Sequence, residues 1–392
     1  MTESRDGRRW MAVGQSAHPD SHAAADAAGR AALAGADPKL LIVFAGIDHD
    51  GTAMLDALGH IAPGVPVIGC STHGEIGPDG AQDDTVLVAA IGGAGFTVST
   101  SVATEVSGRQ RDAGAEVARC VADVGAAPYR VLMLLTDGLL RDQEAILRGC
   151  YRELGASIPL FGGAAGDAWR MTGAYVLGDG RTMSDAVVAA TITSDAPLSL
   201  AVRHGWHEVG EPMIVTSAEL GRVYTLDDRP AMDLFLDRLS APPDAYTDTQ
   251  AFTQFALSRP LGVRRRSGLE ARNVSTEVDM AGRSIGGGSA IDHGSLVWAM
   301  TGDEESIAAA TDQACEQALT GLGAYEPVGM LTLSCAGLRA VLGEGGTRRE
   351  SERLAKWAAG IPFAGFHTYG EIARIRGIDG FHNQTLAVLA FA

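Results

Sequence analysis

Three stretches of the sequence repeat one pattern, and this repetition restricts the fold more than any other feature of the chain. Each stretch has a proline at the start of an apolar run, a glycine three residues later, and an acid directly after a second glycine. The copies lie at 65–76, 158–167 and 361–372. We interpret each copy as an apolar strand that leaves the core and ends in a polar loop, where binding residues concentrate.

Apolar runs and helical periodicities around these copies divide most of the chain into three units of one plan. The expected strands lie at 10–16, 40–46, 85–91, 96–102, 131–135, 186–192, 296–300 and 330–334. The expected helices lie at 21–35, with Ser21 as the cap, and at 52–60, 142–154, 303–322 and 350–359. The sequence therefore predicts an α/β fold of layered mixed sheets covered by helices and built from repeated β-α-β-α-loop-β units.

The length of 392 residues favours two domains over one ordinary core. We place the boundary after residue 222, so that residues 1–222 hold two of the units. Residues 223–392 then hold an irregular insert and the third unit, which we expect to begin at 296–300. The less regular region already starts at an alternating strand, 198–202.

Composition narrows the class of partner. The chain has 31 Lys and Arg residues against 48 Asp and Glu residues, which gives a net charge of −17. Nucleic acids and anionic membranes bind clusters of cations, so neither is an expected partner. Five cysteines without a C-x-x-C pair indicate a reducing compartment, and no segment approaches the roughly 18 apolar residues of a membrane span. We therefore expect a soluble, cytoplasmic protein.

Several of these segments resemble the FIST proteins, in both the N-terminal and the C-terminal FIST domain. The similarity includes 69–76, 162–167 and 222–232, and it extends from about residue 36 to the end of the chain. Its most specific part is Tyr-Gly-Glu-Ile at 369–372, followed shortly by His-Asn-Gln-Thr at 382–385.

That resemblance implies a sensory module of signal transduction that binds a small ligand. Amino acids or similar metabolites are the ligands proposed for the family, and some bacterial members are haem proteins that sense nitric oxide. Because the sequence contains no kinase, cyclase or receptor segment, the resemblance implies a separate signalling partner, such as a histidine kinase. The oligomeric state stays open, with a homodimer as one expectation.

The polar loops supply the candidate ligand-binding residues. Glu75, Asp167 and Glu371 hold equivalent positions, where a carboxylate accepts hydrogen bonds from a ligand ammonium or from backbone amides. The other candidates near the end of the chain are Tyr369, His382, Asn383 and Thr385. Two interpretations remain open: these side chains line a pocket, or they cap helices and tie the repeated loops together.

Haem is the candidate cofactor that the resemblance adds. A haem iron needs an axial imidazole inside an apolar pocket, and the absence of C-x-x-C-H leaves only non-covalent haem b. The candidate axial ligands are His73, His204, His207, His367 and His382. His18 and His22 have helical spacing, but no acid completes the set, so we expect no metal site there.

An enzyme is the competing class of function. Cys70 and His73 could act as nucleophile and base in a small-molecule hydrolase or transferase. However, a thiol that follows an apolar strand is ordinarily buried, and the third copy has Phe366 at the place of Cys70. Nucleophile-elbow, Walker and Rossmann patterns are also absent from the sequence. We therefore expect a sensory protein rather than an enzyme.

Overall fold

Apolar strands and the helices that cover them form three similar units in the computed structural model, which describes residues 9–219, 221–265, 268–287, 289–375 and 380–392. The first unit contains β1 (Trp10–Ser16), α1 (Ser21–Ala32), β2 (Pro38–Gly46), α2 (Gly51–Ile61), β3 (Val67–Thr72), β4 (Glu75–Gly77), β5 (Gly80–Gln82) and β6 (Val86–Gly92). The second contains β7 (Phe96–Thr104), α3 (Gln110–Ala118), η1 (Arg119–Asp123), β8 (Tyr129–Thr136), α4 (Gln143–Leu154), β9 (Leu160–Ala164), β10 (Val176–Gly178), β11 (Arg181–Met183) and β12 (Ala186–Ser194). The third contains β13 (Leu198–Arg203), α7 (Glu304–Thr320), β21 (Gly329–Cys335), α8 (Ala336–Ala358), β22 (Phe363–Thr368), β23 (Glu371–Arg374), β24 (Phe381–His382) and β25 (Leu386–Phe391).

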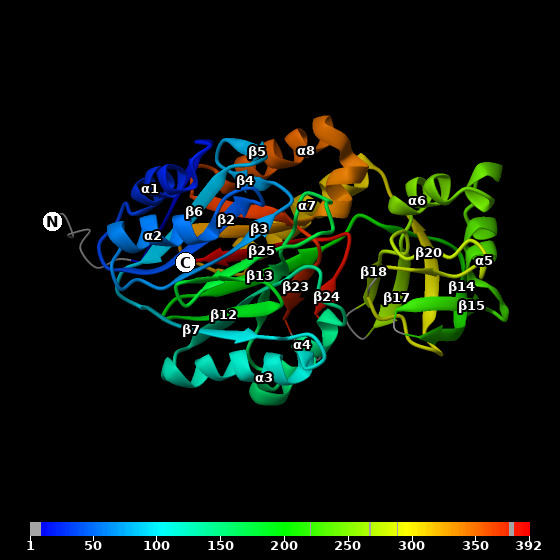
Figure 1. Ribbon diagram of the computed structural model, residues 1–392, viewed down its shortest axis with the longest axis horizontal. Coiled ribbons are helices and arrows are strands. Elements are labelled where there is room, and N and C mark those ends of the chain that lie inside the picture. The colour runs from blue at the N-terminus through cyan, green and yellow to red at the C-terminus, as the bar shows by residue number, and fades with distance from the viewer. Residues whose placement is uncertain (1–8, 220, 266–267, 288, 376–379) are drawn as a thin grey trace.

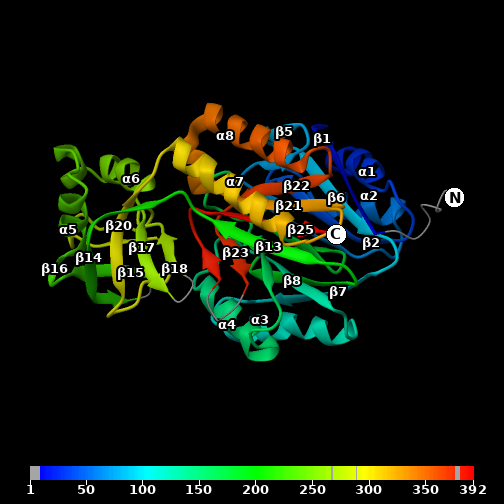
Figure 2. The same cartoon turned by 180° about the vertical axis from the view of Figure 1, so that it is seen from behind.

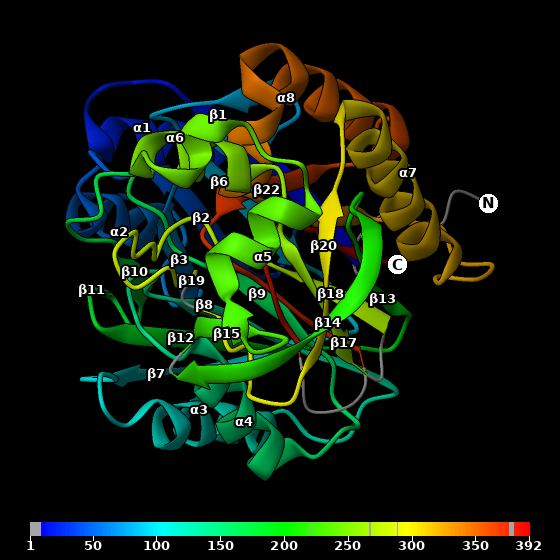
Figure 3. The same cartoon turned by 90° about the vertical axis from the view of Figure 1, so that its right-hand side faces the viewer.

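The short hairpin of each unit joins the sheet of a different unit. The hairpin β4–β5 extends the sheet of the third unit, β10–β11 extends the first sheet, and β23–β24 extends the second. The strand orders are β1-β6-β2-β3-β10-β11, β7-β12-β8-β9-β23-β24 and β13-β25-β21-β22-β4-β5. The three sheets therefore share one plan and are linked in a closed cycle. Seen end-on in Figure 3, the pairs α1–α2, α3–α4 and α7–α8 cover three sides of this main body.

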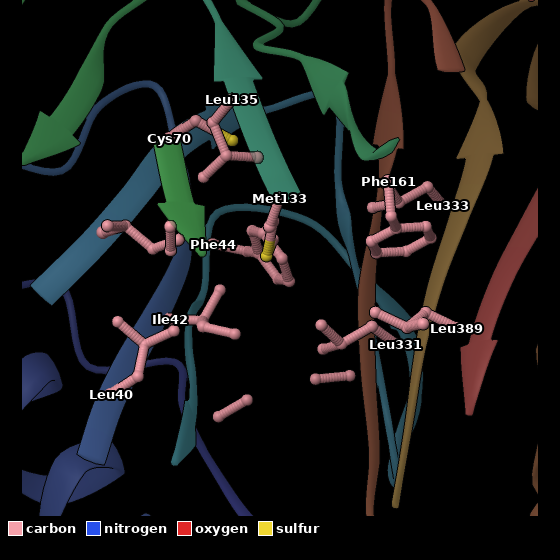
Figure 4. Close-up of a cluster of buried hydrophobic side chains, with 14 of the residues drawn as sticks. Leu40, Ile42, Phe44, Cys70, Met133, Leu135, Phe161, Leu331, Leu333 and Leu389 are labelled. Carbon is pink, nitrogen blue, oxygen red and sulfur yellow. The ribbon is translucent and has the colours of Figure 1, made fainter. Parts of the chain in front are cut away.

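One apolar core lies between the three sheets (Figure 4). The central strands β2, β8 and β21 are buried on both faces, which explains their continuous apolar sequences. Alternate residues point into the shared core: Leu40, Ile42 and Phe44 from β2, Met133 and Leu135 from β8, and Leu331 and Leu333 from β21. Their neighbours, such as Leu41 and Val43, pack against the covering helices.

Close backbone packing explains the repeated Pro-x-x-Gly pattern. The three glycines lie against the backbone of the neighbouring parallel strand, where a side chain does not fit. A Cβ atom would lie 2.5 Å from Val43 O at Gly69, 1.8 Å from Leu134 O at Gly162, and 1.8 Å from Thr332 O at Gly365. Strand pairing therefore requires glycine at all three positions, and Gly162 also has a backbone conformation (φ 157°) that other residues rarely adopt.

The irregular region forms an inserted domain between β13 and α7, on one side of the main body (Figures 1 and 2). Its elements are β14 (His207–Glu219), β15 (Arg222–Leu226), β16 (Arg229–Pro230), α5 (Ala231–Arg238), η2 (Pro243–Tyr246), α6 (Thr249–Leu257), β17 (Leu261–Arg265), β18 (Gly268–Arg272), β19 (Ile285–Gly286) and β20 (Leu296–Thr301). It has its own apolar core, which includes Met213, Phe235, Phe252 and Val297.

The layered α/β architecture is confirmed, but the expected start of the third unit is wrong. The strand at 296–300 is β20, which pairs with β14 and β17 inside the inserted domain. The third unit instead begins with β13 at Leu198, so its first strand precedes residue 222. The boundary after residue 222 stays a prediction about the two sequence domains.

Two details of the helices also differ from expectation. Asp20, rather than Ser21, caps α1, because its Oδ1 accepts a 2.8 Å hydrogen bond from Ala23 N. The helix expected at 350–359 is the last part of α8, which begins at Ala336 and kinks at Gly343 (φ 63°). No helix among the described residues combines the length and apolar character that a membrane crossing requires.

The packing at Gly365 gives the first testable prediction. We expect Gly365→Ala to lower the free energy of unfolding by about 2 kcal/mol or more, because the new Cβ would overlap Thr332 O at 1.8 Å. Gly59→Ala in α2 is the matched control, since nothing lies within 4 Å of its new Cβ and alanine stabilises a helix by up to about 1 kcal/mol. Urea unfolding of both variants measures the difference, and equal stabilities would contradict this account.

Candidate ligand-binding site

The three repeated loops meet at the ends of β3, β9 and β22. Backbone hydrogen bonds join them in pairs: His73 N to His367 O at 3.1 Å, Gly166 N to Ser71 O at 2.9 Å, and Tyr369 N to Ala164 O at 3.1 Å. This junction follows from the exchange of hairpins, since each loop leads from one sheet into the next. The three repeated loops therefore share one location.

The buried carboxylates of Glu75 and Glu371 connect neighbouring segments of the chain through hydrogen bonds. Glu75 Oε2 accepts hydrogen bonds from Thr85 N at 3.0 Å and Thr85 Oγ1 at 2.7 Å. Glu371 Oε2 accepts the equivalent bonds from Thr385 N at 3.2 Å and Thr385 Oγ1 at 2.8 Å. Burial raises the pKa of Glu75 to about 7 and that of Glu371 to about 8, although these hydrogen bonds favour the ionised form. The pairs hold the ends of the hairpins in place.

Asp167 and Tyr369 together position the side chain of Trp169. The Tyr369 hydroxyl donates to Asp167 Oδ1 at 2.8 Å and accepts from Trp169 N at 2.6 Å. Although burial acts to raise the pKa of Asp167, hydrogen bonds from Tyr369 and from the Thr172 and Gly173 amides lower it. The Trp169 indole stacks on the Tyr369 ring with 4.9 Å between centroids, and it remains 42% exposed.

A pocket of about 490 Å³ lies where these loops meet the inserted domain, and we call it the interdomain pocket. Its volume is within the usual range for sites that bind small molecules. The main body contributes Gly138, Leu139, Leu140, Arg141, Trp169, Met171, Cys335, Ala336, Gly337, Thr368, Tyr369 and Asn383. The inserted domain contributes Asn273, Thr276, Glu277 and Gly287. The pocket therefore has walls from two parts of the molecule.

Two opposite charges lie close together in the lining of this pocket. Arg141 follows β8, Glu277 belongs to the inserted domain, and their side chains are 3.8 Å apart, from Nη2 to Oε1. The Arg141 side chain is 82% exposed, so this pair contributes little to stability and leaves both groups able to bind a ligand. A larger groove of about 650 Å³ between α7 and α8 is less suitable, because Arg349 and Arg353 there already bind Glu304 and Asp312.

The segment from His382 to Thr385 joins the main body to the inserted domain. Asn383 Oδ1 accepts a 2.5 Å hydrogen bond from Ser289, and Gln384 Nε2 donates to Leu257 O at 2.9 Å. On the side of the main body, His382 Nε2 bonds to Ala373 O at 3.0 Å. This segment therefore links both walls of the interdomain pocket.

Comparison with known proteins shows the family of this chain. The FIST N domain matches residues 39–229, and the FIST C domain matches residues 231–374. The chain belongs to the FIST family. An uncharacterized protein found in two strains of Mycobacterium tuberculosis is 25% identical over 394 residues, covering 97% of this chain and 99% of that protein. FIST domains are sensory domains of signal transduction that bind small ligands.

Of the residues that the sequence proposed as ligand contacts in this FIST protein, Tyr369 and Asn383 line the interdomain pocket. The remaining candidates are buried outside the pocket and form hydrogen bonds with neighbouring protein groups: Glu75, Asp167, Glu371, His382 and Thr385. Sequence reasoning missed Arg141, Trp169 and Glu277. Arg141 could have been found, because binding residues gather after the carboxyl ends of parallel strands. Trp169 and Glu277 depend on tertiary structure that no local pattern indicates.

The candidate axial histidines do not fit haem in this pocket, because none of the five is among its described lining residues. Both ring nitrogens of His204 are engaged, with Leu269 O and Trp206 N, and His382 Nε2 is bonded to Ala373 O. Burial lowers the pKa of His73 to about 4 and that of His367 to about 3, so both rings are neutral, but neither ring lines the interdomain pocket. His207 is exposed beside His204 in a separate groove.

Cys70 does not fit the role of a nucleophile. Its side chain is fully buried in the core shared by the three sheets, and Figure 4 shows it beside Leu135. Burial raises the pKa of the Cys70 thiol well above its ordinary value, and the Glu75 carboxylate adds to this effect. A catalytic thiol requires access and a lowered pKa, so the alternative interpretation of this FIST protein as a hydrolase or transferase gains no support from Cys70.

Three buried carboxyl groups make folding stability depend on pH. Burial raises the pKa of Glu350 to about 7, in addition to the raised values at Glu75 and Glu371. Between about pH 5 and 8 the folded chain retains protons that the unfolded chain has released, so the free energy of unfolding falls as pH rises. Over this range of pH, we expect the free energy of unfolding of Glu75→Gln to fall by about 2 kcal/mol less than that of the parent chain, because the variant lacks one of these carboxyl groups.

Urea unfolding at several pH values measures this slope. Glu153→Gln, on the exposed face of α4, is the matched control and should keep the slope of the parent chain. A slope in Glu75→Gln equal to that of the parent would show that Glu75 is ionised in the folded protein.

Proposed function

We propose that this FIST protein is a sensory protein that binds an amino-acid-like metabolite in the interdomain pocket and reports its presence to a separate signalling protein, such as a histidine kinase. The observation that carries the proposal is that both the main body and the inserted domain line the pocket. A bound molecule therefore contacts both parts and favours one arrangement of them over another.

The chemistry of the pocket suits a molecule with two opposite charges. The guanidinium of Arg141 would bind a carboxylate, and the carboxylate of Glu277 would accept hydrogen bonds from an ammonium group. Asn273 and Thr276 add neutral polar groups from the inserted domain. Leu139, Met171 and the exposed indole of Trp169 provide an apolar wall for the rest of the ligand.

Binding would replace the loose contact between Arg141 and Glu277 by contacts with the ligand. Because these residues belong to different parts, the exchange changes how strongly the inserted domain is held against the main body. The change reaches Asn383 and Gln384, whose side chains bond to the inserted domain. A separate protein that contacts the inserted domain could then distinguish the bound state from the free state.

Thermal unfolding with a panel of the twenty L-amino acids tests this function. At one hundred times its dissociation constant, a bound amino acid should stabilise the parent chain by about 2.7 kcal/mol, which is visible as a rise in Tm. We expect Arg141→Gln and Glu277→Gln to lose at least ten-fold in affinity, since each removes one charge contact. N-acetyl and amide derivatives of the best amino acid should show the same loss in the parent chain.

Two exposed residues outside the pocket provide matched controls. Arg152→Gln in α4 and Glu208→Gln in β14 remove the same charges elsewhere and should bind like the parent. If all four variants bound the amino acid with the affinity of the parent chain, the binding site would lie outside the interdomain pocket. If no amino acid raised the Tm of the parent chain, this ligand class would be refuted. A Soret band after haem reconstitution would identify haem b as the ligand instead.

A further inference from the structure

His22, Asp56 and His60 bring three metal-binding side chains together on the surface of the first unit. His22 lies in the first turn of α1, and the other two residues lie one turn apart on α2. One ligand atom from each residue lies within 4.8 Å of those of the other two. The separations are 3.6 Å from His22 Nε2 to Asp56 Oδ2 and 3.7 Å from His60 Nδ1 to Asp56 Oδ1.

The 3.6 Å between His22 Nε2 and Asp56 Oδ2 is too long for a hydrogen bond but suits two ligands of one cation. A divalent metal binds imidazole nitrogen and carboxylate oxygen at about 2.0 to 2.2 Å, so its ligand atoms are roughly 3 to 3.5 Å apart. The side chains are 50%, 62% and 71% exposed, and small rotations are therefore free to bring them together. Without a cation, exposed contacts of this kind contribute little to stability.

The surroundings of His60 also favour a metal ligand. Its Nδ1 lies 2.7 Å from Asp56 O, so Nδ1 carries the proton and Nε2 keeps its lone pair. Ligating histidines commonly donate their other ring N–H to a backbone carbonyl in this way. His60 lies in the last turn of α2, where the partial negative charge of the helix end attracts a cation.

We propose that His22, Asp56 and His60 form a binding site for a divalent transition-metal ion, of which Zn²⁺ is the best match. Two imidazoles and one carboxylate suit this class of metal, and water would complete the coordination. The bound ion would clamp the beginning of α1 to the end of α2. The sequence indicated no such site, because His22 was paired there with His18 and its partners come from a different helix.

Titration calorimetry of the tag-free, metal-stripped full chain with ZnCl₂ tests the site. We expect one Zn²⁺ per chain in the parent and at least a ten-fold loss of affinity in His22→Ala, His60→Ala and Asp56→Asn. The matched control is His18→Ala, which removes an exposed histidine outside the cluster and should bind like the parent.

Co²⁺ provides a second readout, because its visible absorption reports nitrogen and oxygen ligands directly. Zn²⁺ should also raise the Tm of the parent but not that of His22→Ala. Absence of Zn²⁺ binding at millimolar concentration in the parent, or unchanged binding in all three cluster variants, would overturn the proposal. Neither result depends on a ligand in the interdomain pocket.

Discussion

The exchange of hairpins between sheets is the constraint on which the rest of the structure depends. Each of the three sheets is completed by two strands from another unit, so no unit can bury its edge strand alone. Gly69 pairs with Val43 and Gly365 with Thr332, and these backbones approach too closely for a side chain at either glycine. The same crossings force the three loops to one place, where backbone bonds join them. The three copies of the sequence pattern therefore correspond to the three strands and loops that meet at this junction.

Much of the main body could be predicted from the sequence, because its central strands are buried on both faces and appear as continuous apolar runs. A strand was also correctly predicted at 296–300, but it was wrongly assigned to the third unit for the same reason. Its residues Val297 and Trp298 also form an apolar run, although β20 belongs to the inserted domain. Periodicity reports burial and does not report which sheet a strand joins. The exchange of hairpins was unpredictable too, since the glycine pattern indicates close strand pairing but not which sheet the following hairpin joins.

Only part of the candidate site could be predicted from local sequence patterns, because the rest depends on tertiary structure. The repeated pattern predicted equivalent positions for acids such as Glu75 and Glu371, and both residues follow loops that meet at the junction. Their carboxylates, however, face Thr85 and Thr385 rather than a cavity, because a buried acid needs nearby donors to satisfy it. The charges that face the pocket, Arg141 and Glu277, come from segments that meet only after folding.

The cyclic main body and the inserted domain also differ in how freely they can move. Within the main body, any shift of one sheet would disturb the hairpin that it shares with a neighbour. The inserted domain has its own core and meets the main body through polar side chains, including Asn383, Gln384 and Glu144, and through a small apolar cluster that includes Met300 and Leu338. Side-chain contacts of this kind cost less to rearrange than paired strands. A ligand in the interdomain pocket would therefore change the position of the inserted domain rather than the shape of the main body.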